Sequence, residues 1–329
     1  MELPRIPDDI NIKRFSHSRL GYVLAVSAAA LSGLIHSVSK PLLTPTDSTM
    51  IEINPLTLAV IIYIINGLFF TPIKKTKSTN NKIGKKNLVV LGIIGIAEAA
   101  ALILYFFGLK ESTAVNASIL TNSEIIFTTL IAFTIFQERL KKMELGPFSM
   151  IIAGIVLLPL GYDLYNSGFV FTNLVFGNLL IIFSGAFYAL DYNLCKYVSN
   201  KIDAKRITQL ASFASGGFAL CLIFIFQIPF EVNVSQLPRI IVIGLFGTGV
   251  ATFFFINSLR LIGAIRTVLI FSSTTVFGIF FANIFLQETV SIQNILSMIL
   301  VFSGIYLLRN RLGKSKTIDE SIDTESKKN

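Results

Sequence analysis

Residues 109–138 read LKESTAVNASILTNSEIIFTTLIAFTIFQE, and residues 259–288 read LRLIGAIRTVLIFSSTTVFGIFFANIFLQE. The two stretches align without a gap at a constant offset (259 − 109 = 150 residues), and both end in Gln-Glu. A second similarity, between the stretches that begin at Gly21 and Gly177, extends the repeat toward the start of each half. A duplicated unit of this length determines how the whole fold is built.

Apolar segments long enough to cross a membrane recur along both halves. Hydrophobic residues make up 53% of the chain and charged residues only 14%, which is not the composition of a soluble domain. About 20 apolar residues in a helix span about 30 Å of hydrocarbon. We predict ten such helices, at residues 20–38, 55–73, 88–109, 114–136, 145–164, 174–195, 207–230, 237–259, 267–286 and 292–308.

The predicted fold class is an all-α polytopic membrane protein whose ten transmembrane helices form two inverted five-helix repeats. The first repeat covers residues 20–165 and the second residues 174–308, with an amino-terminal tail at 1–19 and a disordered polar tail at 309–329. An odd number of helices per unit inverts the second unit in the membrane. Inverted repeats are typical of secondary transporters, with the substrate site at the interface between the units.

The net charge of +9 reflects membrane topology rather than nucleic-acid binding. Of the 28 Lys and Arg residues, only Lys40, Lys110 and Arg239 lie away from the tails and the even-numbered connections. The positive-inside rule therefore predicts a multi-pass protein of the cytoplasmic membrane with both termini in the cytoplasm. The polar segment before the first helix predicts no cleavable signal peptide. The expected partners are membrane lipid and a small-molecule substrate.

The first copy of the repeat carries a family signature. SEIIFTTLIAFTIFQERL, residues 123–140, resembles the fourth-helix signature of the drug/metabolite transporter superfamily, in its EamA-type group of ten-helix carriers, and residues 273–290 resemble the ninth-helix counterpart. The similarity includes Gly154 and Gly304, but Ile125 stands where the family often has a proline. The resemblance implies a central cavity lined by helices 1 to 4 and 6 to 9, with helices 5 and 10 at the periphery.

A small and polar stripe runs along the fourth predicted helix, at Ala117, Thr121, Glu124, Thr128 and Ala132. A charged side chain at mid-membrane costs at least about 2.5 kcal/mol on insertion scales and often marks function. We therefore predict that Glu124, Thr121 and Thr128 line the cavity. The ninth helix keeps the stripe without the acid, because Thr274 occupies the position of Glu124.

A second acid, Glu98, lies halfway along the third helix and shares its face with Tyr105. Two carboxyls at mid-depth in adjacent helices can share a proton, so Glu98 and Glu124 are candidates for coupling transport to protons. The alternative is that one or both are structural, hydrogen-bonded to neighbours such as Thr121 or Tyr105. On the second helix, Tyr63 and Asn66 would add an aromatic ring and an amide to the cavity, or would serve packing alone.

Two further ionisable groups lie nearer the helix ends. Asp191 on the sixth helix shares a face with Tyr188, and His36 lies on the first helix. Because histidine changes charge near neutral pH, these positions suit gates or a proton path, although polar groups near helix ends also reach the headgroup region. That second interpretation is the one we give to Lys40 and Lys196, while Glu138 and Glu288 are expected to anchor helix ends.

The predicted function is secondary transport of a small metabolite, namely an amino acid, amine, nucleoside or drug-like compound, outward and linked to protons. The absence of Lys and Arg at mid-depth disfavours phosphorylated substrates, which need cationic partners. The alternative is an antiporter for nucleotide sugars or sugar phosphates, which would require Lys110, Arg260 or Arg266 to reach inward.

Other functional classes are less well supported. An intramembrane aspartyl protease needs two juxtaposed aspartates, and Asp191 has no such partner in the seventh helix. Inverted repeats favour alternating access over a channel. The chain has no nucleotide-binding loop of the Walker type and no metal-ligand spacing, so we expect no cofactor, no metal and no enzymatic activity. Both a monomer and a homodimer remain open.

Overall fold

A computed structural model describes residues 8–46, 50–71, 83–135 and 142–308, and these residues form helices and no strand. Eight helices are long and apolar enough to cross a membrane, and two shorter apolar helices, Pro55–Phe69 and Ile292–Leu308, complete the set. The ten predicted segments are thus confirmed as helices of a multi-pass membrane protein.

The first half contains α1 (Asp8–Leu43), α2 (Pro55–Phe70), α3 (Lys85–Glu111), α4 (Ala114–Leu120), α5 (Ser123–Ile135), α6 (Lys142–Val156), η1 (Leu157–Asp163) and α7 (Leu164–Asn166). The second half contains α8 (Asn173–Ser199), α9 (Ala204–Phe226), η2 (Val234–Gln236), α10 (Leu237–Val242), η3 (Ile243–Val250), α11 (Ala251–Ile262), α12 (Ala264–Phe271), α13 (Thr274–Leu286) and the helix Ile292–Leu308. Because α1 begins at Asp8, it includes much of the segment that we assigned to the amino-terminal tail.

The fourth and ninth predicted helices are each broken near the middle, where we expected continuous helices. α4 ends before Thr121-Asn122 and α5 follows, while α12 ends before Ser272-Ser273 and α13 follows. Short hydroxyl and amide side chains compete with the backbone for hydrogen bonds and so favour a turn here. Asn122 Nδ2 donates to the carbonyl oxygen of Ile119 at 3.0 Å, and Ser272 Oγ donates to that of Leu269 at 2.8 Å. At the repeat offset of 150 residues the two breaks differ by one position, and neither contains a proline.

Two other spans change to π-helix, at η1 and at η3. Pro159 lies inside η1, where its missing N–H disturbs the α-helical ladder. In η3, Thr248 Oγ1 donates to the carbonyl oxygen of Ile243 at 3.0 Å. Two glycines in η3, Gly244 and Gly249, face α2, and a Cβ on Gly244 would lie 3.4 Å from the Ile62 carbonyl oxygen. π-helical segments often occur at functional sites.

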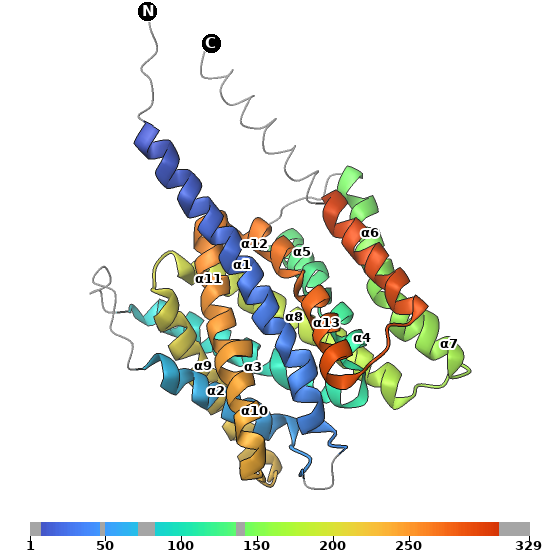
Figure 1. Ribbon diagram of the computed structural model, residues 1–329. Helices are drawn as coiled ribbons and strands as arrows, with labels where there is room; N and C mark the ends of the chain where they lie inside the picture. Colours follow the sequence, from blue (N-terminus) through green and yellow to red (C-terminus); the bar gives the residue numbers. More distant parts are fainter. Residues whose placement is uncertain (1–7, 47–49, 72–82, 136–141, 309–329) are drawn as a thin grey trace, which may run out of the picture.

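The two halves pack against each other in exchanged pairs. α3 packs along α8, and its repeat counterpart, η3 with α11, packs along α1. Likewise α5 packs on α8 while α13 packs on α1, and α2 packs on α9. Figure 1 shows α1, α11 and α13 side by side. In these pairs, a helix and its repeat counterpart each pack against equivalent helices of the opposite half, as expected for an inverted repeat.

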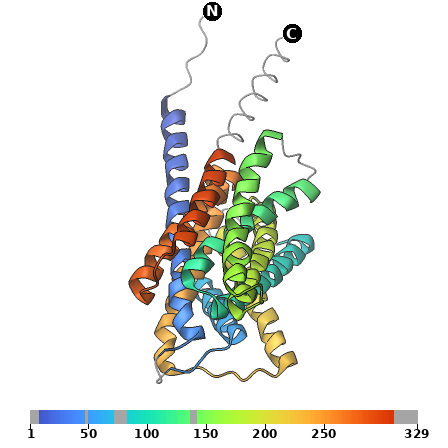
Figure 2. The same cartoon turned by 90° about the vertical axis from the view of Figure 1, so that its right-hand side faces the viewer.

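The fifth and tenth spans lie at one edge of the bundle, as the family resemblance implies. The helix Ile292–Leu308, drawn in red, runs beside α6 (Figure 1), and Figure 2 shows α6 in front when the molecule is viewed from that edge. They cross at glycines related by the repeat. A Cβ on Gly154 would lie 2.9 Å from the Ser297 carbonyl oxygen, and one on Gly304 2.7 Å from that of Pro147. Such close backbone approach is typical of helix packing in membranes.

Candidate functional site

A cavity lies at the centre of the bundle, where the two broken helices meet. α4 packs on α13, and Asn122 Nδ2 donates to Thr275 Oγ1 at 2.6 Å across the two breaks. The lining comes from α1, α2, α3, α4 with α5, α8, η3 with α11, and α12 with α13. Its residues are Ser32, Ile35, His36, Tyr63, Glu98, Tyr105, Thr121, Asn122, Glu124, Tyr188, Asp191, Tyr192, Cys195, Gly247, Thr248, Ala251, Thr252, Phe255, Ile256, Phe271, Ser272, Thr274 and Thr275.

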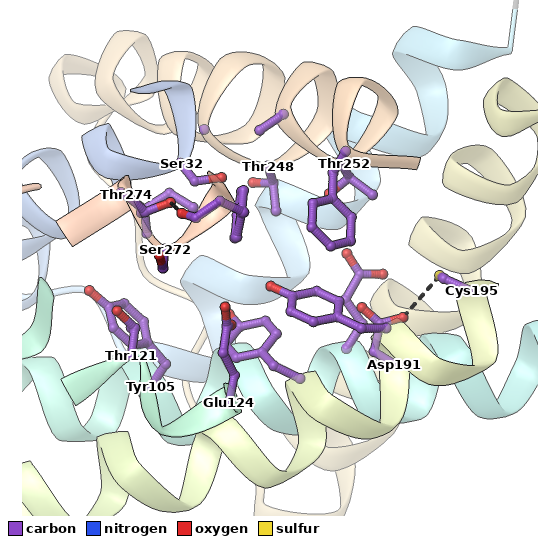
Figure 3. A pocket seen from close by; sticks show the side chains of 18 of the residues that line it. Ser32, Tyr105, Thr121, Glu124, Asp191, Cys195, Thr248, Thr252, Ser272 and Thr274 are labelled. Atoms are coloured by element: carbon purple, nitrogen blue, oxygen red, sulfur yellow. Dashed lines mark hydrogen bonds between the residues drawn. The ribbon is translucent and has the colours of Figure 1, made fainter. Parts of the chain in front are cut away.

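Three carboxyl groups, from three different helices, face this cavity. Glu98, Glu124 and Asp191 are 7%, 5% and 7% exposed, respectively. Asp191 lies close enough to interact electrostatically with both glutamates. The labelled side chains of Glu124 and Asp191 are visible in Figure 3. None of the described lining residues is Lys or Arg, so no cationic side chain there neutralises these acids.

Two of the three carboxyls accept a side-chain hydrogen bond. Ser215 Oγ donates to Glu98 Oε2 at 3.3 Å, and Cys195 Sγ donates to Asp191 Oδ1 at 3.2 Å. The Tyr192 hydroxyl lies close enough to the Glu124 carboxyl to interact with it electrostatically. Glu124 also lies in the first turn of α5, where the helix dipole favours a negative charge. The helix break therefore gives this acid a more favourable position than the middle of a continuous helix.

Four aromatic rings form a continuous wall of the same cavity. The ring centroids of Tyr192 and Phe255 are 4.7 Å apart, and those of Phe255 and Phe271 are 4.8 Å apart. Tyr188 stacks on Tyr192 with centroids 6.2 Å apart. The rings come from α8, α11 and α12, so together they connect three helices of the second half. We refer to Tyr188, Tyr192, Phe255 and Phe271 as the aromatic wall.

A histidine and a tyrosine form a buried pair in the lining. His36 Nδ1 and the Tyr105 hydroxyl are 2.5 Å apart, and the rings meet edge to face with centroids 5.6 Å apart. His36 is 3% exposed, and its Nε2 has no hydrogen-bond partner among the described residues. Another lining tyrosine, Tyr63, donates from its hydroxyl to the Glu98 carbonyl oxygen at 2.9 Å.

A central cavity between inverted repeats is typical of transporters, and the comparisons with known proteins show a transporter family. Residues 19–160 and 175–310 both match the EamA-like transporter family. The chain belongs to the EamA-like transporter family. An uncharacterized transporter of Methanothermobacter thermautotrophicus is 28% identical over 303 residues, which cover 88% of this chain and 85% of that protein.

Two more matches extend this comparison. The uncharacterized transporter YyaM of Bacillus subtilis is 25% identical over 276 residues, which cover 80% of this chain and 86% of YyaM. A solved crystal structure superposes with a TM-score of 0.62 at 15% identity, and the match covers 89% of this chain and 98% of that one. At this identity the solved structure supports the shared fold alone. The EamA assignment, by contrast, rests on the sequence of both halves.

Most of the site residues expected from the sequence do line the cavity of this EamA protein. They are Glu124, Glu98, Thr121, Thr274, Tyr105, Tyr63, Tyr188, His36 and Asp191. Thr128 and Asn66 are not among the lining residues. Asn66 is buried with both amide atoms unpartnered, and its side chain lies against Gly249 of η3. Thr128 Oγ1 is likewise buried without a partner.

Several lining residues were not expected from the sequence. Tyr192 lies one helical turn after Tyr188, so helical spacing provided a signal for it. Phe255, Phe271 and Thr252 gave no comparable signal, because an apolar or hydroxyl residue in a transmembrane helix faces lipid, a neighbouring helix or a cavity equally well. α9 supplies no lining residue, and its role at the site is the hydrogen bond from Ser215 to Glu98.

The charged helix ends are engaged in local contacts away from the cavity. We expected Lys40 to reach toward the headgroups, but it does not. Its Nζ instead donates to the carbonyl oxygens of Leu109 and Lys110, both at 2.9 Å. Lys110 pairs with Glu52. The anchoring expected of Glu288 is confirmed. Its carboxylate accepts hydrogen bonds from the backbone N–H groups of Ala114 and Val115, at the start of α4, at 3.0 and 2.9 Å. Glu138 lies outside the described residues.

Proposed function

We propose that this EamA transporter is a secondary carrier that binds a small metabolite in the central cavity and exchanges it for protons. The single observation that carries the proposal is the group of three buried carboxyls, contributed by both halves, in a cavity whose described lining has no basic side chain. Ionisable groups inside a membrane bundle are typical of proton relays and substrate sites. Neither ATP nor a cofactor is needed for such exchange.

Alternating access is supported by how the halves contact each other at the end where α3 meets α4. Glu288 after α13 caps α4, and Asn294 Nδ2 donates to Asn116 Oδ1 at 2.7 Å. Ser112 at the end of α3 also hydrogen-bonds to Asn178 of α8. These contacts join residues distant in sequence and lie beyond the cavity toward one end. Opening that end would require them to separate, which is the movement expected of inverted repeats.

The orientation and direction of transport follow from sequence and family resemblance. The distribution of Lys and Arg favours cytoplasmic termini in the cell membrane, and the resemblance to EamA-type carriers favours export. Three carboxyls that can lose and regain a proton provide the groups that couple proton movement to substrate transport. A proton taken up as the substrate leaves keeps the cavity from holding unpaired charge in a low dielectric.

The alternative, an exchanger of nucleotide sugars or sugar phosphates, has less support. It needs a basic side chain in the cavity, but Arg260 donates to the Ile202 carbonyl oxygen and pairs with Asp203 at 3.7 Å. Lys110 is paired with Glu52, and Arg266 is exposed and absent from the lining. An aspartyl protease mechanism is also disfavoured, since Asp191 is the one aspartate among the described lining residues.

Proteoliposomes loaded with a pH-sensitive dye test the proposal. Amino acids, amines, nucleosides and sugar phosphates are added in turn to the native protein, to Glu124→Gln and to Glu231→Gln, which changes an exposed acid outside the cavity. We expect at least one non-phosphorylated compound to drive proton movement in the native and Glu231→Gln proteins but not in Glu124→Gln. Exchange of sugar phosphates without proton movement, unchanged in Glu124→Gln, would reject the proposal in favour of the antiporter.

A further inference from the structure

We infer that the substrate of this cavity is a small organic cation, an alkylammonium ion held between the three carboxyls and the aromatic wall. The inference rests on the proposed carrier function and assigns the class of molecule that is carried. It draws on four observations: the sign of the charge in the cavity, the arrangement of the rings, the unpartnered histidine and the lack of a basic side chain for an anion in the described lining.

The charge of the cavity favours a cation strongly. Glu98, Glu124 and Asp191 are all more than nine-tenths buried, and Asp191 interacts with both glutamates. Opposite charges attract several-fold more strongly at an effective dielectric of about 20 than in water. A cationic substrate therefore supplies the positive partner that the described lining lacks, and a proton supplies it when the substrate is absent.

The aromatic wall provides the second half of the binding site. Tyr192 is a ring of the wall and lies close enough to Glu124 to interact with its carboxyl, so the wall is adjacent to an acid. Aromatic faces attract organic ammonium ions through their quadrupole, and cages of rings recognise quaternary ammonium groups in particular. Rings beside carboxyls thus match a molecule whose charge is buried within an apolar shell of methyl groups.

A residue of the cavity lining also carries an unpartnered polar atom. His36 lines it, is 3% exposed, and leaves Nε2 without a described partner. A buried polar atom of this kind costs free energy unless it is bound by water or ligand. With Nδ1 occupied by the Tyr105 hydroxyl, Nε2 is free to bind a hydroxyl group on the substrate.

A zwitterionic amino acid fits the same cavity less well, because its carboxylate finds no basic side chain in the described lining. The N-terminal ends of α5 and α13 would be the natural partners, but four of their backbone N–H groups already donate within the chain. Glu124 N donates to the Thr121 carbonyl oxygen at 3.2 Å, and Thr275 N donates to that of Ser272 at 3.2 Å. Ile125 N and Val276 N are also bonded. An anion would additionally face three carboxyls.

The size of the cavity limits the cation. Its volume is about 100 Å³, about three times a water molecule's share of liquid volume, so the cavity suits a small molecule. Choline is a suitable probe, since it joins a trimethylammonium group to one hydroxyl. Three compounds of nearly the same shape differ from it in charge: the zwitterion glycine betaine, the neutral alcohol neohexanol, in which carbon replaces nitrogen, and the anion tert-butylacetate.

Isothermal titration calorimetry of the full-length protein in detergent, with each of the four compounds, tests the inference. We expect choline to bind and the other three to bind at least about ten-fold more weakly. Asp191→Asn should weaken choline binding by at least about ten-fold, and Tyr192→Leu by about two- to thirty-fold. Phe281→Leu, which removes a ring that is not part of the cavity lining, and Glu231→Gln should leave choline binding unchanged. Size-exclusion profiles confirm that each variant is folded.

Preferential binding of glycine betaine, neohexanol or tert-butylacetate would overturn the inferred class, and so would the absence of choline binding. Neither result would reject the carrier itself, which is judged by substrate-driven proton movement in proteoliposomes. Conversely, choline binding that drives no proton movement in the native protein would support the cation site and reject proton exchange. The two proposals therefore fail separately.

Discussion

Glu124 illustrates how a single residue acquires its role from local backbone structure. In a continuous helix it would be a costly charge at mid-membrane, but the turn at Thr121-Asn122 places it in the first turn of α5. There the helix dipole, the Tyr192 hydroxyl and the nearby Asp191 all act on the same carboxyl. Its repeat counterpart, Thr274, also lies in the first turn of a helix, α13, and carries no charge. The asymmetry confines the acid to one side of the cavity.

Cation binding should weaken as the pH falls, because protons and the cation compete for the same carboxyls. The competing groups are Glu98 of α3, Glu124 of α5 and Asp191 of α8, and the other titratable groups that line the cavity are His36, Tyr63, Tyr105, Tyr188, Tyr192 and Cys195. We expect the apparent Kd of choline to rise with falling pH in the native protein and to rise less steeply in Glu124→Gln. Calorimetry over a pH series checks this. A Kd that does not vary with pH would contradict competition at these acids.

Tyr105→Phe should destabilise the protein by about 1–3 kcal/mol, because it leaves His36 Nδ1 buried without its partner. The ring remains, so the packing of this buried side chain changes little. Thermal unfolding in detergent provides the measurement, with Tyr306→Phe as the control, since Tyr306 is exposed. Equal melting temperatures for the native protein and Tyr105→Phe would show that the hydrogen bond contributes no stability.

At the level of helices, Glu288 links the end of α13, in the second half, to the start of the broken helix α4, in the first half. Two backbone N–H groups of α4 donate to its carboxylate. Glu288→Gln replaces a charge-assisted cap by a neutral one, and we expect a loss of about 0.5–2 kcal/mol in unfolding free energy. Glu231→Gln is the matched control. A melting temperature unchanged from that of the control would mean that the cap is not formed in the detergent-solubilised protein.

The crossing of α6 with the helix Ile292–Leu308 should tolerate no added methyl group. A Cβ on Gly154 would lie 2.8 Å from Val301 Cγ2 and 2.9 Å from the Ser297 carbonyl oxygen, whereas a Cβ on Gly217 would meet nothing within 4 Å. Gly154→Ala should therefore cost about 1–3 kcal/mol. Gly217→Ala should be neutral or stabilising by up to about 1 kcal/mol, because alanine favours helix. We therefore expect Gly154→Ala to melt at a lower temperature than Gly217→Ala. The reverse order would contradict the close crossing.

Sequence reasoning captured the helices better than their interruptions. Hydropathy located all ten spans because a bilayer demands long apolar helices. The turns at Thr121-Asn122 and Ser272-Ser273 were missed, although short polar residues at both positions gave a local signal. The π-helical segments, η1 and η3, gave none beyond Pro159 and three glycines. For the cavity, polar residues at helical spacing were informative, whereas Phe255 and Phe271 could be assigned only once α11 and α12 were packed against α8.

For the whole molecule, the repeat explains why related contacts occur at opposite ends. Lys110 pairs with Glu52 at the end of α3, and its repeat counterpart Arg260 pairs with Asp203 at the end of α11. The partly exposed side chains make both pairs weak sources of stability. Their matching positions instead show that each half forms the same type of contact with a loop, once at each end of the bundle. An inverted repeat in which either end can be held closed is what alternating access requires.

The central claim, that this cavity opens to each side of the membrane in turn, is tested most directly at Cys195. The chain has 2 cysteines, and Cys221→Ser leaves Cys195 as a single reporter that already lines the cavity. Its labelling by membrane-impermeant thiosulfonates is measured from either face of sealed vesicles, with Thr274→Cys as a second reporter. We predict labelling from both faces, faster with a cationic than an anionic reagent and slowed by choline. Labelling of both reporters from one face alone, whatever the substrate, would contradict the account.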